Sequence, residues 1–381
     1  MKRGNVLVVG NSGVGKSTLI NAVLGKDVAK TGWGTSGTTR ELEIYESEEL
    51  PFRIIDSIGF EPSLIKAQKA VNTVKKWSKE SAKEGKEDNQ INLIWFCVDG
   101  TSRKLFPETI KSMVRATSMW KNVPMVVVIT KSYSEPERRE NINLVHYAFL
   151  KQKRNTKNLQ GVLPVVAAPY IINEYAMASP FGITELIDLT NELMPQGIKA
   201  AQVDMSNFKL RRKRALAHGV VSALTVSGVV VGAVPVPFPD GLILQPIELA
   251  EVNTIAQIYE IHKKEETKVL INSIVEVGTV GIAARAALNA LKVVPGINLA
   301  ASVMNAIIAG AFVAAIGEGT IYAFEQVYLG KKSIEDIDWF KKIIESKISN
   351  DFIKKVTEIL EKTTSTADTK TISKLINSVF R

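Results

Sequence analysis

A lysine and a serine follow a glycine-rich loop near the start of the chain, and together they can bind phosphate and a divalent cation. The run Gly10-Asn11-Ser12-Gly13-Val14-Gly15-Lys16-Ser17 fits the phosphate-loop pattern G-x-x-x-x-G-K-[ST] at every fixed position. Its backbone N–H groups can turn toward a phosphate, Lys16 can reach the β- and γ-phosphates, and the Ser17 hydroxyl can ligate Mg²⁺. An ordinary glycine-rich turn is the alternative, but it does not require a Lys-Ser pair at this spacing. The predicted phosphate-binding residues are Asn11, Ser12, Gly13, Val14, Gly15, Lys16, Ser17 and Thr18.

The elements that must position this loop can be read from the first 194 residues, where short apolar runs alternate with helical patterns. The predicted strands are Val6–Val9, Leu42–Tyr45, Phe52–Ile55, Asn92–Val98, Met125–Ile129 and Val162–Val166. The predicted helices lie near 16–24, 64–83, 107–119, 137–151 and 183–193. Such alternation predicts an α/β fold, a mostly parallel sheet covered on both faces by helices. Ligands of these sheets bind at the carboxyl ends of the strands, where the phosphate loop stands.

Two further motifs follow the phosphate loop in order. Gly37-Thr38-Thr39-Arg40 fits a switch motif, and Asp56-Ser57-Ile58-Gly59 fits the pattern D-x-x-G at the end of a predicted strand. With these motifs, the first half resembles P-loop GTPases of the translation-factor-like superfamily, and among them the Era/TrmE group of small bacterial GTPases. The resemblance implies that GTP or GDP binds with Mg²⁺, that Lys16, Thr39 and Gly59 are catalytic, and that Ser17, Thr39 and Asp56 hold the metal. Thr38 is a less favoured candidate than Thr39.

Two positions depart from the GTPase pattern. Phe60 follows the D-x-x-G glycine, where Ras-like GTPases carry a catalytic glutamine, so hydrolysis without a partner is expected on the order of 10⁻⁴ to 10⁻² s⁻¹. The guanine-reading motif N/T-K-x-D corresponds to Thr130-Lys131-Ser132-Tyr133, with a tyrosine in place of the aspartate. The resemblance therefore implies that the nucleotide is bound by Thr130 and Lys131. A weak match of Ala167-Ala168 to the S-A type motif adds Ala168 to these residues. Without that aspartate, an acceptor for the base would have to come from Ser132, Ser134 or Glu135 after a shift of the loop.

Composition restricts the class of protein. The chain has 381 residues, 45% hydrophobic and 23% charged, which is typical of globular domains and excludes a disordered chain. The single cysteine, Cys97, lies in an apolar run, so no disulfide framework is expected. Residues 1–4 lead directly into the first predicted strand, so we expect no signal peptide and a cytoplasmic protein. A net charge of +9 is compatible with RNA, with anionic lipid or with neither.

After Pro195 the pattern becomes helical throughout, and no strand pattern appears, so the second half is predicted to be all-α. We expect a GTP-binding domain at 1–195 and a basic linker at 196–214. A hydrophobic helical domain is expected at 215–330, and amphipathic helices at 331–381. The three histidines, His146, His218 and His262, have no ligand partners at metal spacing.

The second half is apolar enough to raise the question of a membrane. Ala215–Val234 carries no formal charge and is long enough to span a bilayer, and Val277–Ile316 is a second apolar stretch. The alternatives are a bundle that packs on itself, and membrane insertion or attachment at the inner face of the membrane. The basic cluster Lys209–Arg214 favours anionic lipid, although it can also be a charged helix start. Motifs within Pro235–Pro246 and Ile316–Glu318 resemble an uncharacterised helical domain that follows Era-like GTPase domains and associates with membranes.

Three functions are consistent with these observations. The first is a slow, Mg²⁺-dependent GTPase switch that relays its nucleotide state to a helical domain in contact with a membrane or a protein partner. The second is an RNA- or ribosome-assembly GTPase, although the second half shows no clear nucleic-acid module. The third is a nucleotide-binding scaffold with negligible turnover. Partners left open are anionic lipid or a membrane through residues 209–330, and a second GTP-binding domain.

Overall fold

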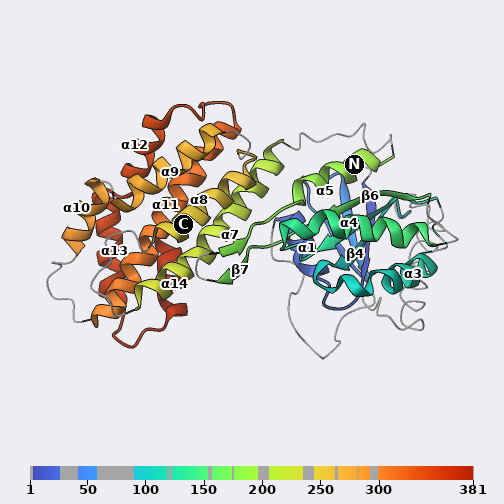
Figure 1. Cartoon of the computed structure of the whole chain (residues 1–381), viewed down its shortest axis with the longest axis horizontal. Coiled ribbons are helices and arrows are strands. Elements are labelled where there is room, and N and C mark those ends of the chain that lie inside the picture. Colours follow the sequence, from blue (N-terminus) through green and yellow to red (C-terminus); the bar gives the residue numbers. More distant parts are fainter. Residues whose placement is uncertain are drawn as a thin grey trace. The chain divides into compact units, whose positions relative to one another are not determined.

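The computed structural model describes residues 3–25, 42–57, 90–117, 120, 122–152, 157–173, 176–195, 206–234, 244–261, 265–280, 282–291 and 299–380. The chain forms two compact units, and Figure 1 shows the elements of each. The first comprises Met1–Ala168 and Pro180–Arg212. The second comprises Pro169–Ser179 and Lys213–Arg381.

The first unit is built on a six-stranded sheet in the order β2-β3-β1-β4-β5-β6. The strands are β1 (Gly4–Gly10), β2 (Leu42–Tyr45), β3 (Phe52–Ser57), β4 (Leu93–Asp99), β5 (Met125–Thr130) and β6 (Leu159–Pro164). Only the β2–β3 pairing is antiparallel among the pairings of this sheet. The mostly parallel sheet predicted from the sequence is therefore confirmed.

Helices cover both faces of this sheet. They are α1 (Lys16–Leu24), α3 (Phe106–Ala116), α4 (Glu135–Leu150) and α5 (Ile183–Leu193), with a 3₁₀ helix, η2 (Gly100–Leu105), after β4. β3, β4 and β5 extend past their predicted ends to the polar residues Ser57, Asp99 and Thr130. Backbone pairing continues there, because Asp99 lies opposite Thr130 in the β4–β5 ladder. Hydrophobic patterning cannot detect such an extension, since it follows side chains and not the backbone ladder.

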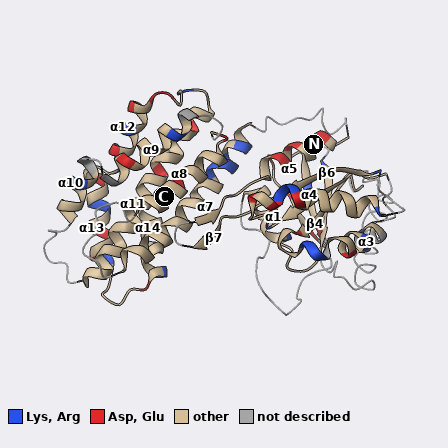
Figure 2. Cartoon of the chain, viewed as in Figure 1, with Lys and Arg blue, Asp and Glu red and all other residues tan. Residues whose placement is uncertain are grey.

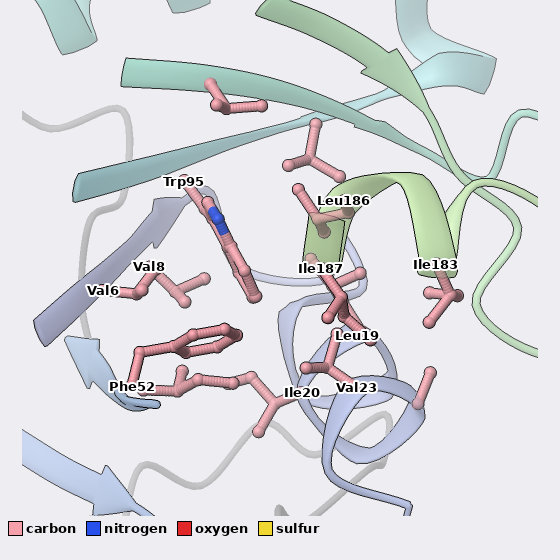
Figure 3. Close-up of a cluster of buried hydrophobic side chains, with 14 of the residues drawn as sticks. Val6, Val8, Leu19, Ile20, Val23, Phe52, Trp95, Ile183, Leu186 and Ile187 are labelled. Carbon is pink, nitrogen blue, oxygen red and sulfur yellow. The ribbon is translucent and has the colours of Figure 1, made fainter. Parts of the chain in front are cut away.

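One face of the sheet packs against α1 and α5. Figure 3 shows Trp95 and Phe52 of the sheet beside Leu19 of α1 and Ile187 of α5. The two aromatic rings pack edge to face with their centroids 6.0 Å apart, and the Trp95 indole donates to the Thr190 hydroxyl over 2.9 Å. Burying such side chains stabilises the fold by about 1.5–3 kcal/mol each. This core holds α1, and with it the phosphate loop, in place.

The opposite face packs against α3 and α4. Along β1, Val6 and Val8 belong to the first core while Leu7 and Val9 belong to the second, as the two-residue period of a strand requires. Every residue of β1 is buried, which is the property of a central parallel strand covered on both faces.

The second unit is a helical bundle with one hairpin. Its helices are α7 (Ser206–Gly232), α8 (Gln245–Ile258), α9 (Glu265–Val280), α10 (Ile282–Leu291), α11 (Ala301–Tyr328), α12 (Ile337–Lys347), α13 (Asn350–Lys362) and α14 (Thr369–Phe380). All described elements after residue 205 are helical, as predicted. The hairpin of β7 (Tyr170–Asn173) and β8 (Ala176–Ala178) was not predicted, because its residues do not alternate between buried and exposed. Residues 206–214, expected to be linker, form the start of α7.

α11 is the central helix of this bundle, and its residues from Ala306 to Gly317 are all buried (Figure 1). It lies unusually close to α7: a Cβ atom added to Gly232 would be only 2.6 Å from the carbonyl oxygen of Asn305. α7 and α11 are both long and apolar enough to cross a membrane, but the most apolar window of α11 is 89% buried inside the bundle. Burial of this kind is also a property of the core helices of soluble proteins.

Candidate functional site

The phosphate loop connects the carboxyl end of β1 to the first turn of α1. Gly13 and Gly15 have φ angles of 74° and 98°, a left-handed conformation that side chains with a Cβ atom rarely adopt. At Gly10, an added Cβ would lie 2.8 Å from the carbonyl oxygen of Cys97 on β4. The glycines of the motif are thus required by backbone conformation at two positions and by close packing at a third.

Lys16 is held at the mouth of this loop. Its ammonium donates to the carbonyl oxygens of Gly10 over 2.8 Å and of Asn11 over 3.0 Å. Both acceptors are neutral backbone groups, so the positive charge of Lys16 is not neutralised by them. A phosphate bound at the N-terminus of α1 would meet this ammonium and the positive end of the helix dipole.

Asp56 lies beside this charge. It stands on β3, opposite Val8 of the adjacent parallel strand, and is 6% exposed. Its Oδ1 atom has no hydrogen-bond partner among the described residues. Burial raises the pKa of this carboxyl, and the positive charge of Lys16 opposes that shift.

The residues at this point fit a magnesium ion. The buried, unpartnered carboxylate oxygen of Asp56 and the half-buried hydroxyl residue Ser17 are hard oxygen donors of the kind that Mg²⁺ prefers. Among the described residues, no group of three or more His, Cys, Asp or Glu side chains could hold a metal by itself. A magnesium ion here would therefore take the rest of its ligands from phosphate oxygens and water.

The predicted base-reading segment is tied directly to the phosphate loop. The Thr130 hydroxyl lies 2.5 Å from the carbonyl oxygen of Val14 and 2.9 Å from that of Val98. Lys131, at a left-handed φ of 51°, donates to the carbonyl oxygen of Gly13 over 2.8 Å. The structure therefore brings Thr130 and Lys131 together with the loop residues predicted to bind phosphate.

Asp99 belongs to this site, and sequence reasoning missed it. Its Oδ2 atom accepts from the Lys131 ammonium over 2.7 Å, and Oδ1 accepts from the backbone and hydroxyl of Thr101. Burial alone would raise the pKa of this carboxyl, but the hydrogen bonds from Lys131 and Thr101 outweigh it and lower the pKa. The available signal was an acidic residue at the carboxyl end of a strand, the edge where ligands of parallel sheets bind.

The last two residues of the predicted base-reading segment are Ser132 and Tyr133, so no carboxylate stands at its fourth position. Tyr133 is half-buried, and its N–H donates to the carbonyl oxygen of Lys131 over 2.8 Å. The Ser132 hydroxyl donates to the carbonyl oxygen of Ile129 over 2.7 Å and is therefore directed into the protein. Ala168 lies two residues beyond Val166, which pairs with Phe181 beside the sheet. Thr39, Gly59 and Phe60 lie outside the described residues.

The comparisons with known proteins bear on this half of the chain. Residues 5–131 match the model of a family described as 50S ribosome-binding GTPase. The match covers the phosphate loop, Asp56 and Lys131, the residues whose geometry is described above. Residues 5–131 are therefore similar to P-loop GTPase domains, and this similarity covers a third of the chain. The α/β fold with a parallel sheet, predicted from the sequence, is the fold of such domains.

Individual relatives match over similar segments. GTPase Der of Campylobacter hominis is 29% identical over 147 residues, which are 37% of this chain and 28% of Der. GTPase Era of Actinobacillus pleuropneumoniae is 28% identical over 165 residues, 43% of this chain and 49% of Era. A solved structure of an Aquifex aeolicus Era variant bound to GDP.AlF4- is 19% identical, covers 58% of this chain and 68% of that one, and has a TM-score of 0.32. The chain thus spans less than half the length of these curated relatives.

The basic residues at the start of α7, coloured blue in Figure 2, were predicted as a contact for anionic lipid, but several of them have acidic partners within their own unit. In the first unit, Lys209 pairs with Asp188 and Arg211 with Glu49. In the second unit, Lys213 pairs with Glu260 and Arg214 with Glu325. Arg212 is 6% exposed, and burial lowers the pKa of its guanidinium to about 10. These contacts correspond to the alternative interpretation, a charged helix start.

Proposed function

We propose that this protein binds GTP and GDP with Mg²⁺ and hydrolyses GTP slowly. The observation that carries the proposal is the position of Lys16, whose ammonium lies in a left-handed glycine loop at the N-terminus of α1. The adjacent Asp56 has a buried carboxylate oxygen without a partner among the described residues. A triphosphate supplies negative charge for the Lys16 ammonium, and a magnesium ion supplies positive charge for the Asp56 carboxylate.

The proposed roles follow from the geometry and, for the residues outside it, from the motifs. Lys16 stabilises charge on the β- and γ-phosphates, while Ser17 and Asp56 hold the magnesium ion. Thr39 closes over the metal and the γ-phosphate, and the Gly59 N–H senses the γ-phosphate. With Phe60 in place of a glutamine, a partner or another group must orient the attacking water, and turnover without it is slow.

Turnover tests this proposal. The full chain is mixed with radiolabelled GTP in a single-turnover experiment with and without Mg²⁺, and wild type is compared with Asp56→Asn. We expect release of phosphate only with Mg²⁺, at a rate reduced at least about tenfold in the variant. Tight binding of GTP without measurable hydrolysis would instead establish the nucleotide-binding scaffold. Absence of GTP binding would overturn the proposal.

We propose further that the helical unit receives the nucleotide state and contacts a membrane or a protein partner, at the inner face of the cytoplasmic membrane. The length and hydropathy of α7 and α11 support a membrane, while the pairing of the basic cluster leaves fewer cations for lipid headgroups. Flotation of the full chain with anionic and with neutral vesicles, in GTP and in GDP, tests this. Nucleotide-dependent flotation supports membrane contact, and a chain that never floats contradicts it.

A second candidate function is supported by the description of the matching family, which names binding to the 50S ribosome. Sedimentation of the full chain with purified 50S subunits distinguishes this function from the first, because the switch protein would remain in the supernatant.

A second GTP-binding domain is the remaining partner proposed. Light scattering of the full chain with a non-hydrolysable GTP analogue would show a doubled mass if the domains pair.

A further inference from the structure

Two glutamates of α8 lie in the interior of the helical unit without partners. Glu248 and Glu251 are each 0% exposed. None of their carboxyl oxygens has a hydrogen-bond partner among the described residues. They are three positions apart along α8, so they lie on one side of the helix. A buried carboxylate without a partner is strongly unfavourable, and two on one helix face would also repel each other.

The carboxyl group of Glu251 occupies a space left by a glycine. A Cβ atom added to Gly317 of α11 would lie 2.5 Å from the Glu251 Oε1 atom and 2.5 Å from a methyl carbon of Val221 on α7. Glu251 therefore reaches the point where α8, α11 and α7 meet, and its position depends on close packing there. Neither carboxyl oxygen of Glu251 has a hydrogen-bond partner among the described residues, so nothing described there offsets a negative charge.

No described ionisable side chain of the packed elements forms a hydrogen bond with either carboxyl. On α11, Glu318 is 2.8 Å from His218 of α7, and Glu325 is paired with Arg214 of α7. On α9, Lys268 and Glu276 are exposed to solvent, and β8 carries no ionisable residue. Burial raises the pKa of both carboxyls well above the ordinary value, and the negative charges of Glu248 and Glu318 raise that of Glu251 further.

Protons can neutralise the two carboxyls without any further ligand. Among the described residues, no group of three or more His, Cys, Asp and Glu side chains is placed to hold a metal ion. With one proton on each carboxyl, α8 can remain packed against α11 without a buried charge. On separation of the two helices both carboxyls would reach water and ionise.

We propose that Glu248 and Glu251 form a protonation latch, which holds α8 against α11 while both carboxyls are protonated and releases α8 when they ionise. The direction of its pH dependence follows from proton linkage. The packed state binds more protons than the open state, so its stability is fully present at low pH and falls as pH rises through the range between the ordinary and the raised pKa values. If two protons leave on opening, the equilibrium constant for opening rises about 100-fold per pH unit in that range.

Opening would expose a large apolar surface. The residues of α11 from Ala306 to Gly317 are buried, and α8 is one of the helices that cover them. The latch therefore makes exposure of this surface depend on local pH. It does not depend on the proposed GTPase activity, since the nucleotide site belongs to the first unit and the latch to the second.

Hydrogen exchange tests the latch. Exchange of the full chain is followed by mass spectrometry for wild type and for the double variant Glu248→Gln with Glu251→Gln, at about pH 5 and about pH 8. Because the two proteins are compared at the same pH, differences in intrinsic exchange cancel. At the higher pH we expect peptides of α8 and α11 to exchange at least about tenfold faster in wild type than in the variant, and at the lower pH we expect nearly equal rates. The proposal would be overturned if the ratio of the wild-type to the variant exchange rate were the same at both pH values. It would also be overturned if the variant exchanged faster than wild type at the higher pH.

Two controls separate the latch from other effects. Glu276→Gln removes an exposed carboxylate of α9 and should exchange like wild type at both pH values. Lys16→Ala should keep the wild-type pH response even if it abolishes nucleotide binding, so failure of the latch and failure of the proposed function are distinguishable.

If the double variant does not fold, Glu251→Met replaces it, with urea unfolding measured over the same pH range. The expected result is a stability that changes less with pH than that of wild type.

Discussion

The ammonium of Lys131 is 2.8 Å from the carbonyl oxygen of Gly13 and 2.7 Å from the carboxylate of Asp99. One side chain thus joins three segments: the phosphate loop, the end of β4 and the segment after β5. Both contacts fix the ammonium end of the side chain, and the hydrocarbon stem is the part proposed to stack on a nucleotide base. The orientation of Lys131 therefore depends on Asp99, and Lys131 adds one contact to the phosphate loop.

Loss of the Asp99 charge should weaken nucleotide binding. In Asp99→Asn, Lys131 keeps its bond to Gly13 but loses a charge-assisted bond of about 1.5–3 kcal/mol, so we expect the Kd for GDP to rise roughly tenfold. Titration of a fluorescent GDP analogue measures this. Glu140→Gln, which removes an exposed partner of Arg103, is the matched control and should bind like wild type. An unchanged Kd in Asp99→Asn would show that Asp99 does not position Lys131.

Loss of the Lys16 ammonium should abolish binding. Lys16→Ala removes the cation proposed to contact the β- and γ-phosphates, so we expect no binding of GTP·Mg²⁺ by calorimetry, while the circular dichroism spectrum stays that of wild type. Lys151→Ala, at the end of α4, is the control and should bind normally. Retained affinity in Lys16→Ala would contradict the assignment of the phosphate loop.

Base choice should be relaxed by Tyr133. An aspartate at this position pairs with the N1 and N2 donors of guanine, and such a site can discriminate by factors near about 10⁴. Because Tyr133 carries no carboxylate and the Ser132 hydroxyl is bonded to Ile129, we expect a modest preference for GTP over ATP and a larger one in Tyr133→Asp. Competition with GTP, ATP and XTP measures both. Full rejection of ATP by wild type would indicate another acceptor, such as Ser134 or Glu135.

The close contact of α7 with α11 should not tolerate a larger side chain. In Gly232→Leu the new side chain would meet the Asn305 carbonyl oxygen and Ala309, so we expect a loss of about 1–3 kcal/mol and a lower Tm of the helical unit. Gly219→Ala on the same helix is the control, because its Cβ would lie 3.5 Å from the Pro169 ring, an ordinary contact. That variant should be neutral or more stable by up to about 1 kcal/mol. Equal effects of the two substitutions would contradict the close helix contact.

Local patterns in the sequence determined the phosphate loop, the parallel sheet and the helical second half. Each rests on residues close together in the chain: the spacing from Gly10 to Ser17, and the two-residue and 3.6-residue periods of buried positions. These signals survive without tertiary information because backbone conformation and hydrophobic patterning act locally. Asp56 was predicted correctly as the end of a strand beside this loop, since D-x-x-G follows an apolar run.

Only the tertiary structure determined which side chains far apart in the sequence come into contact. Asp99 and Lys131 are 32 positions apart and pair because β4 and β5 are neighbours in the sheet. Glu248 and Glu251 lie in a helical stretch of mixed polarity whose pattern does not predict their burial, yet α8 places them inside the bundle. The period of a helix shows which residues share a face. What that face contacts depends on the packing of the other helices, and this determines whether a carboxyl is charged in water or neutral in the core.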